Sequence, residues 1–75
     1  MSDIVKRLGL ELKLIRVEAG AKQKDLAIKM RLPAPLLSMY ETGVREPPIE
    51  FLELFAKKFK IPVSKIFSLM EERQT

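Results

Sequence analysis

The sequence has 75 residues, with 14 Lys and Arg against 10 Asp and Glu, a net charge of +4 and an isoelectric point near 9.6. A chain of this length forms one small domain that buries only about 60% of its unfolded surface, so we expect modest stability. It contains no Cys and no His, which excludes disulfides, thiolate nucleophiles and the usual zinc ligands, and removes the commonest general base. We therefore expect neither an enzyme nor a metal or cofactor site.

No stretch of the sequence approaches the roughly 20 apolar residues of a membrane span, and the N-terminus lacks a signal-peptide pattern. We expect a soluble, cytoplasmic protein. Positive charge is concentrated in residues 1–31, which carry eight basic side chains against four acidic ones. This balance fits a polyanionic partner such as double-stranded DNA, although ordinary solubilising charge is the alternative.

The first helix is expected from about Ser2 to Ala19, with Ser2 or Asp3 as its cap and Gly20 at its end. Its core face consists of five apolar residues at helical spacing: Ile4, Val5, Leu8, Leu12 and Ile15. The second helix begins near Gln23 and buries three residues: Leu26, Ala27 and Met30.

Residues 31–33 form a turn, and the third helix follows from about Ala34 to Glu41, burying Leu37 and Tyr40. Pro35 suits the first turn of a helix, where its missing N–H costs nothing. Gly43 can adopt the left-handed conformation that ends a helix.

Residues 44–48 are expected to form a loop, because consecutive prolines disfavour helix before them and favour a start after them. The fourth helix should run from about Ile49 to Lys58, with these aromatic and aliphatic residues inward: Phe51, Leu52, Phe55 and Ala56, with Phe59 closing it. A connector over 60–62 leads to a fifth helix from about Val63 to Glu71, and residues 72–75 should be frayed. We predict an all-α single domain over residues 1–75, with a core from about 4 to 70, no strand and no internal repeat.

Residues 23–43 therefore read as two short helices joined by a tight turn, the spacing of a DNA-binding helix-turn-helix. Further spaced elements agree with this interpretation in order along the chain: Leu12, Arg16, Gly20, Gln23, Leu26 and Ala27, Leu37 to Gly43, Arg45 to Pro47, Leu52, Ala56, Phe59, Ile61, Ile66 and Phe67. On these elements, residues 8–67 resemble the Xre-type helix-turn-helix family, which includes the lambda repressor and Cro proteins. The resemblance implies a compact five-helix bundle whose third helix lies in the major groove.

The resemblance also implies roles for individual residues. Gln23 should bond a DNA phosphate and brace the recognition helix, although a plain polar surface residue is the alternative. Arg16 and Glu41 should form a partly buried structural ion pair. Other residues should contact the DNA backbone, with a solvated charge as the alternative for each lysine: Lys22, Lys24, Thr42 and Arg45.

The base-reading positions depart from the family pattern, which presents polar side chains in the first turn of the third helix. Here that turn holds apolar residues, and one polar group follows a turn later: Ala34, Pro35 and Leu36, then Ser38 and Met39. Base reading would be limited to Ser38, to apolar contacts with thymine methyl groups and to DNA shape.

The turn before this helix also departs from the family pattern. Arg31 stands where Gly is common, and a positive φ at a non-Gly residue costs about 1 kcal/mol. Pro33 replaces the usual capping Ser or Thr, so one helix N–H loses a partner and the turn is open to reshaping.

Two apolar sets are candidates for a protein interface. Leu10, Leu14 and Val17 form a second stripe on helix one, and exposed stripes often mark contact surfaces, although a larger core is the alternative. Ile28 is also expected to point outward.

On helix five, Phe67, Leu69 and Met70 are expected partly outward as a homodimer surface, with packing on helix four as the alternative. A two-fold dimer would place two recognition helices about one DNA turn apart.

The leading hypothesis is a DNA-binding transcriptional regulator, a small phage-like or bacterial repressor that binds an operator as a dimer. The alternative is a protein-interaction module, antirepressor-, antitoxin- or adaptor-like, in which sequence-specific DNA reading is weakened or lost. The apolar first turn of helix three and the stripe on helix one favour the alternative.

Overall fold

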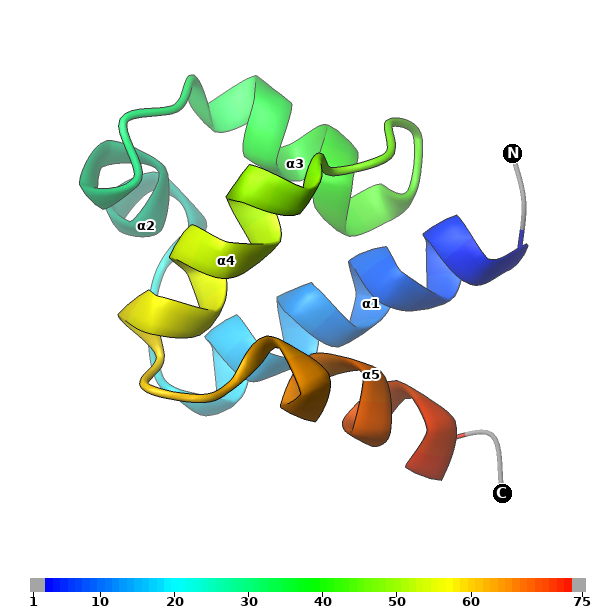
Figure 1. Ribbon diagram of the computed structural model, residues 1–75. Helices are drawn as coiled ribbons and strands as arrows, with labels where there is room; N and C mark the ends of the chain where they lie inside the picture. The colour runs from blue at the N-terminus through cyan, green and yellow to red at the C-terminus, as the bar shows by residue number, and fades with distance from the viewer. Residues whose placement is uncertain (1–2, 74–75) are drawn as a thin grey trace.

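The computed structural model describes residues 3–73, which form five helices and no strand: α1 (Asp3–Glu18), α2 (Gln23–Lys29), α3 (Ala34–Thr42), α4 (Ile49–Lys58) and α5 (Val63–Glu72). In Figure 1, α1 crosses the bundle with α3 packed on one side and α5 on the other. The predicted all-α, five-helix fold is confirmed. Within the described range, no helix has the length and apolar character needed to cross a membrane.

The helix boundaries agree with the sequence prediction to within about a residue. α3 and α5 each extend one residue further than predicted, to Thr42 and Glu72, and α1 ends at Glu18. Ser2, the first candidate cap, lies outside the described residues. Glu72 and Arg73 belong to the segment that we expected to be frayed, but Glu72 completes α5 and Arg73 forms an ion pair with α1.

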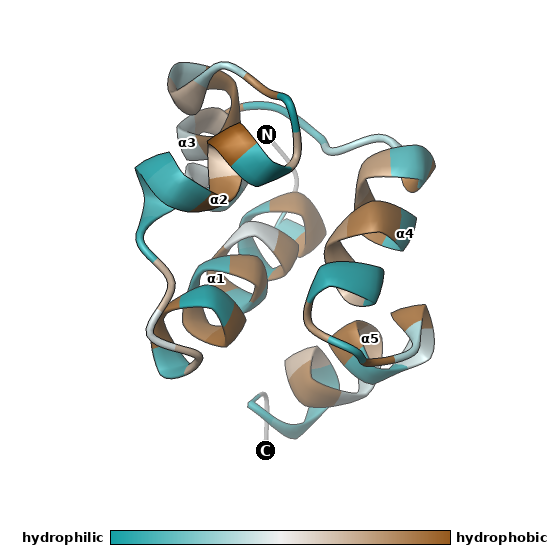
Figure 2. Cartoon of the chain, turned by 90° about the vertical axis from the view of Figure 1, so that its left-hand side faces the viewer, coloured by the Kyte–Doolittle hydropathy of each residue, from teal (hydrophilic) through white to brown (hydrophobic). Residues whose placement is uncertain are grey.

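The core takes apolar side chains from all five helices, and Figure 2 shows hydrophobic residues recurring between hydrophilic ones along the helices. Four of the five residues predicted for the core face of α1 are buried, as are all those predicted for α2 and α3. Ile4 is the exception and the prediction for it is wrong, because 55% of it is exposed. It lies in the first turn of α1, on the edge of an open hollow of about 330 Å³ that the loop before α4 and α5 also line.

Four helices end in the same way, with a residue in the left-handed conformation. The left-handed residues are Gly20 (φ 75°), Arg31 (57°), Gly43 (76°) and Lys60 (58°). In each case the next residue donates its N–H to the carbonyl five positions back, at 2.9–3.0 Å. Hydrogen bonds of this kind satisfy backbone carbonyl groups that have no partner within the helix. The turn at Arg31 therefore keeps regular geometry despite lacking glycine.

The α2–α3 and α4–α5 connections repeat each other. Leu32 N–H bonds to Ala27 O, and Ile61 N–H bonds to Ala56 O. Each turn then reaches a proline that caps the next helix without a side-chain hydrogen bond, Pro33 before α3 and Pro62 before α5. The sequences of the two connections are similar as well, since residues 27–33 and 56–62 share Ala, Lys and Pro at equivalent positions.

Gly9 sets the distance between α1 and α3. A methyl group built on Gly9 would lie 2.3 Å from Tyr40 O and 2.7 Å from Glu41 O. Backbone atoms cannot move away as a flexible side chain can, so only glycine permits this approach. The two helices consequently contact each other through their backbones at this point.

Arg73 ties the end of α5 to the middle of α1. Its guanidinium donates to both oxygens of Glu11, Nε to Oε1 at 2.5 Å and Nη2 to Oε2 at 3.1 Å, and lies 3.8 Å from a carboxylate oxygen of Glu18. Glu11 is 1% exposed. The hydrogen bond to Glu11 raises the pKa of Arg73 above its ordinary value.

We predict that Gly9→Ala destabilises the protein by at least about 2 kcal/mol, because overpacking against backbone outweighs the gain of about 1 kcal/mol in helix propensity. Gly20→Ala is the matched control. Nothing lies within 4 Å of its added methyl group, so only left-handed strain of about 1–2 kcal/mol remains. Chemical denaturation measures the free energy of unfolding of both variants. A Gly9→Ala variant more stable than the wild type would contradict the close contact.

We predict that Arg73→Ala lowers the melting temperature, because it leaves the buried Glu11 carboxylate without its partner. Combining it with Glu11→Leu should recover much of the loss, since the unpaired charge is then removed. Glu18→Ala, at an exposed residue, should have little effect. Thermal melts followed by circular dichroism compare the four proteins, and equal melting of the single and double variants would refute the burial argument.

Candidate nucleic-acid interface

α3 presents one face to the core and the other to solvent. Leu37, Tyr40 and Glu41 are buried, and the Tyr40 ring meets Phe51 edge-on with centroids 4.7 Å apart. The opposite face therefore points away from the bundle, at positions three and four residues apart. This outer face is the surface of α3 that a groove can receive.

A buried network fixes α3 to the end of α1. Arg16 donates Nε to Glu41 Oε2 at 2.7 Å and Nη2 to Glu41 Oε1 at 3.0 Å, and its Nη1 donates to Ala21 O at 2.8 Å. The structure thus brings together the two residues assigned to a structural ion pair, and it buries both. Paired charges in fixed geometry hold the end of α3 in one orientation.

Gln23 joins the same network from the start of α2. Its Nε2 donates to Glu41 Oε1 at 2.9 Å, so the side chain braces α3 directly. A primary amide carries two N–H groups, and the second remains for an anion outside the protein. Lys22 and Lys24, on either side of Gln23, are exposed.

The residues of α3 that we expected in the groove differ in their surroundings. Ala34 and Leu36, which we expected in the groove, are half-buried against the core. The two residues are about 200° apart around the helix, so they lie at the two borders of its buried face, and each borders the core on one side. Among the predicted groove-facing residues, Pro35 is exposed and Ser38 and Met39 are partly exposed.

Thr42 lies at the end of this face and is exposed. Its hydroxyl donates within α3, at 3.0 Å to Ser38 O and 3.3 Å to Met39 O. Its own donor is thereby occupied, while its oxygen can still accept. Arg45, two residues beyond Gly43, is exposed as expected.

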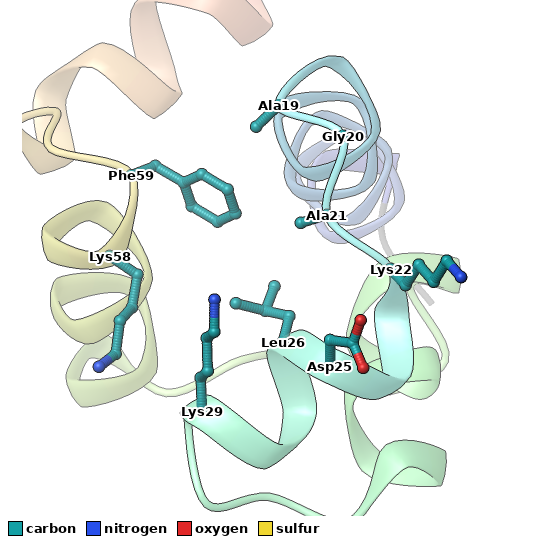
Figure 3. A pocket seen from close by; sticks show the side chains of 9 residues that line it. All are labelled: Ala19, Gly20, Ala21, Lys22, Asp25, Leu26, Lys29, Lys58 and Phe59. Carbon is teal, nitrogen blue, oxygen red and sulfur yellow. The ribbon is translucent and has the colours of Figure 1, made fainter.

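A pocket of about 370 Å³ lies beside α2, between the end of α1 and the end of α4. Figure 3 shows the Phe59 ring and Leu26 projecting into it, with the Lys29 side chain beside Leu26, while Lys22 points away. Asp25 and three lysines are its only ionisable groups, so it offers no nucleophile–base pair. Within residues 3–73, acidic side chains do not gather in threes as a metal site requires.

The predicted interface residues divide into exposed and buried sets. Leu10 and Val17 are each about half exposed, and Leu14 is partly covered. Met70 was expected outward and that prediction is wrong, because only 5% of it is exposed and it belongs to the core. Its position on α5, four residues after the fully buried Ile66, turns it inward. Phe67 and Leu69 are half-buried.

Sequence reasoning missed the residues that set the helix packing. Gly9 was the available signal, because a glycine inside a helix is costly unless a close approach requires it. Glu11 gave a weaker signal, as a carboxylate three residues from Leu8 on a helix that faces the core. Nothing in the sequence pattern pairs it with Arg73, 62 positions away.

Comparisons with known proteins agree with this geometry. A family model described as helix-turn-helix matches residues 12–66. Among solved structures, the DNA-binding domain of BldD from S. venezulae is similar, with a TM-score of 0.77 and 28% sequence identity over 87% of this chain and 97% of that one. No curated protein sequence matches the chain.

We predict that Glu41→Ala destabilises the protein by about 3–5 kcal/mol, because it leaves the buried Arg16 guanidinium unpaired and removes the partner of Gln23. Thr42→Ala, next in the chain but exposed, should cost less than about 1 kcal/mol. Urea denaturation measures both changes. Similar losses for the two variants would show that the network does not hold α3.

Proposed function

Because this chain belongs to the helix-turn-helix family, a family of DNA-binding regulators, we propose that it is a transcriptional repressor that binds an operator as a dimer. In this proposal α3 lies in the major groove and α2 lies across the backbone. The protein acts in the cytoplasm, on double-stranded DNA, without catalysis or a cofactor.

The observation that carries the proposal is the network of Gln23, Glu41 and Arg16. It joins the first turn of α2 to the last turn of α3 through bonds of 2.7–3.0 Å. A phosphate contact at Gln23 would therefore fix the position of α3 relative to the backbone. Lys22, Lys24 and Arg45 are exposed around this network and supply the charge that attracts DNA.

Base reading in this proposal relies on few polar groups. Ser38 offers a hydroxyl, and Pro35 and Met39 offer apolar surface to thymine methyl groups. Much of the remaining discrimination would come from the cost of fitting DNA of a given shape to the rigid α3. We therefore expect a modest ratio of specific to non-specific affinity.

Dimerisation is the second part of the proposal. The hollow beside Ile4 also contains Pro47, Ile49 and Phe67, and Ile4 and Ile49 are both more than half exposed. This apolar surface supports a contact with a second copy that includes Phe67. Leu69, half-buried further along α5, is a candidate for its edge.

The alternative function is a protein-interaction module that uses the helix-turn-helix as a scaffold. The exposure of Leu10 and Val17 on α1 favours it, because this surface lies on a different helix from α2 and α3. The half-buried Ala34 and Leu36 are also consistent with a weakened base-reading face. Such a module would keep the fold and bind a protein through α1.

We predict that selection from random duplexes enriches a preferred site and that affinity for it falls steeply with salt. Gln23→Ala and Arg45→Ala should each weaken binding about three- to tenfold and flatten the salt dependence. Fluorescence anisotropy at several salt concentrations measures both effects. Leu10→Asp is the control, since it changes an exposed residue away from α2 and α3.

Binding without any enriched site would remove the claim of operator recognition. If, in addition, Leu10→Asp abolishes a stable complex with a protein partner, the interaction module is the correct function. Analytical ultracentrifugation with and without the selected duplex tests the dimer, and Ile49→Asp should prevent it.

A further inference from the structure

Arg31 is an exposed cation in the turn that leads into α3. Its φ of 57° is that of a left-handed residue. Met30 before it is buried and Leu32 after it packs against the core, so the turn directs the intervening side chain outward. No hydrogen bond or ion pair of the Arg31 side chain occurs among residues 3–73. The guanidinium is thus displayed to solvent by a rigid turn.

Arg31 and Arg45 lie at opposite ends of α3. Arg31 precedes the first residue of the helix by three positions, and Arg45 follows Thr42 by three. A helix of nine residues is about 13 Å long at 1.5 Å per residue, and the major groove is about 12 Å wide. A long basic side chain at each end can therefore reach the backbones that border the groove.

The left-handed conformation of Arg31 alone is no evidence for a role in binding DNA. Lys60 adopts the same conformation in the equivalent α4–α5 turn, and a cation at a helix C-terminus is favourable in both places. The two turns differ in the helix to which each one leads. Arg31 leads into α3, which packs its end against the Gln23 network, whereas Lys60 leads into α5, which packs along α1.

We propose that the Arg31 guanidinium binds a backbone phosphate of DNA at the amino-terminal end of α3. This inference rests on the proposed DNA-binding function and adds an anchor at a position where the family pattern has glycine and therefore no side chain. Together with Gln23 and Arg45, it would fix α3 from three directions. Phosphate anchoring of this kind raises affinity without adding sequence preference.

The test compares Arg31→Gly with Lys60→Gly, because both substitutions relieve the same backbone strain and remove one positive charge. Thermal melts should show both variants at least as stable as the wild type, which excludes unfolding as the cause of any change. Binding is measured by fluorescence anisotropy from 50 to 200 mM salt, with the selected duplex and an unrelated duplex of equal length.

Arg31→Gly should weaken binding to both duplexes about three- to tenfold and reduce the slope of log affinity against log salt by about 0.9 per bound chain. Lys60→Gly should leave both quantities near those of the wild type. Arg31→Lys should recover most of the affinity, since an ammonium group also binds phosphate.

Three results would overturn the inference. Equal effects of Arg31→Gly and Lys60→Gly would show a general charge effect, and an unchanged slope would show no phosphate contact. A loss confined to the selected duplex would make Arg31 a base reader instead. If the wild type binds neither duplex in a salt-dependent way, the proposed function fails as well. If the wild type binds in a salt-dependent way and Arg31→Gly leaves the affinity and the slope unchanged, the inference alone fails.

Discussion

The arrangement of this protein depends on how α3 is held against α1. Gly9 allows the two backbones to touch, and the Arg16–Glu41 pair locks the end of α3 to the end of α1. The two contacts act together, because the short separation at Gly9 brings the α1 and α3 ends close enough to form a bidentate pair. Gln23 then couples α2 to the same carboxylate, so three helices share one buried anion.

Because these contacts involve only the buried side of α3, the residues on its outer side can differ from the family pattern while the fold is kept. The buried side of α3 carries Tyr40, which packs in the core, and Glu41, which pairs with Arg16. Its outer side is not part of these contacts. The outer side carries both polar and apolar residues, and Ala34 and Leu36 pack partly against the core. In the proposed function, affinity for DNA would then rest mainly on contacts of exposed residues such as Lys22, Lys24 and Arg45 with the DNA backbone.

The helix order and nearly all core positions could be predicted from the sequence, because apolar periodicity, prolines and glycines act locally. The prediction was wrong for two residues: Ile4 was expected in the core and is exposed, and Met70 was expected partly outward and is buried. Ile4 has the right spacing for the core, but it lines an open hollow and stays 55% exposed, unlike its neighbour Val5. Met70 looked peripheral, yet α5 turns it inward one helical turn beyond Ile66.

The sequence by itself determined the five helices and the place of the α2–α3 turn, and the family resemblance indicated the ion pair of Arg16 with Glu41. The left-handed conformation of Arg31, where a reshaped turn was expected, was decided by the structure. Tertiary structure alone decided the backbone contact at Gly9, the pairing of Glu11 with Arg73 and the partial burial of the first turn of α3. These features depend on distances between segments far apart in the chain. Such distances arise only when the helices pack, so no local pattern records them.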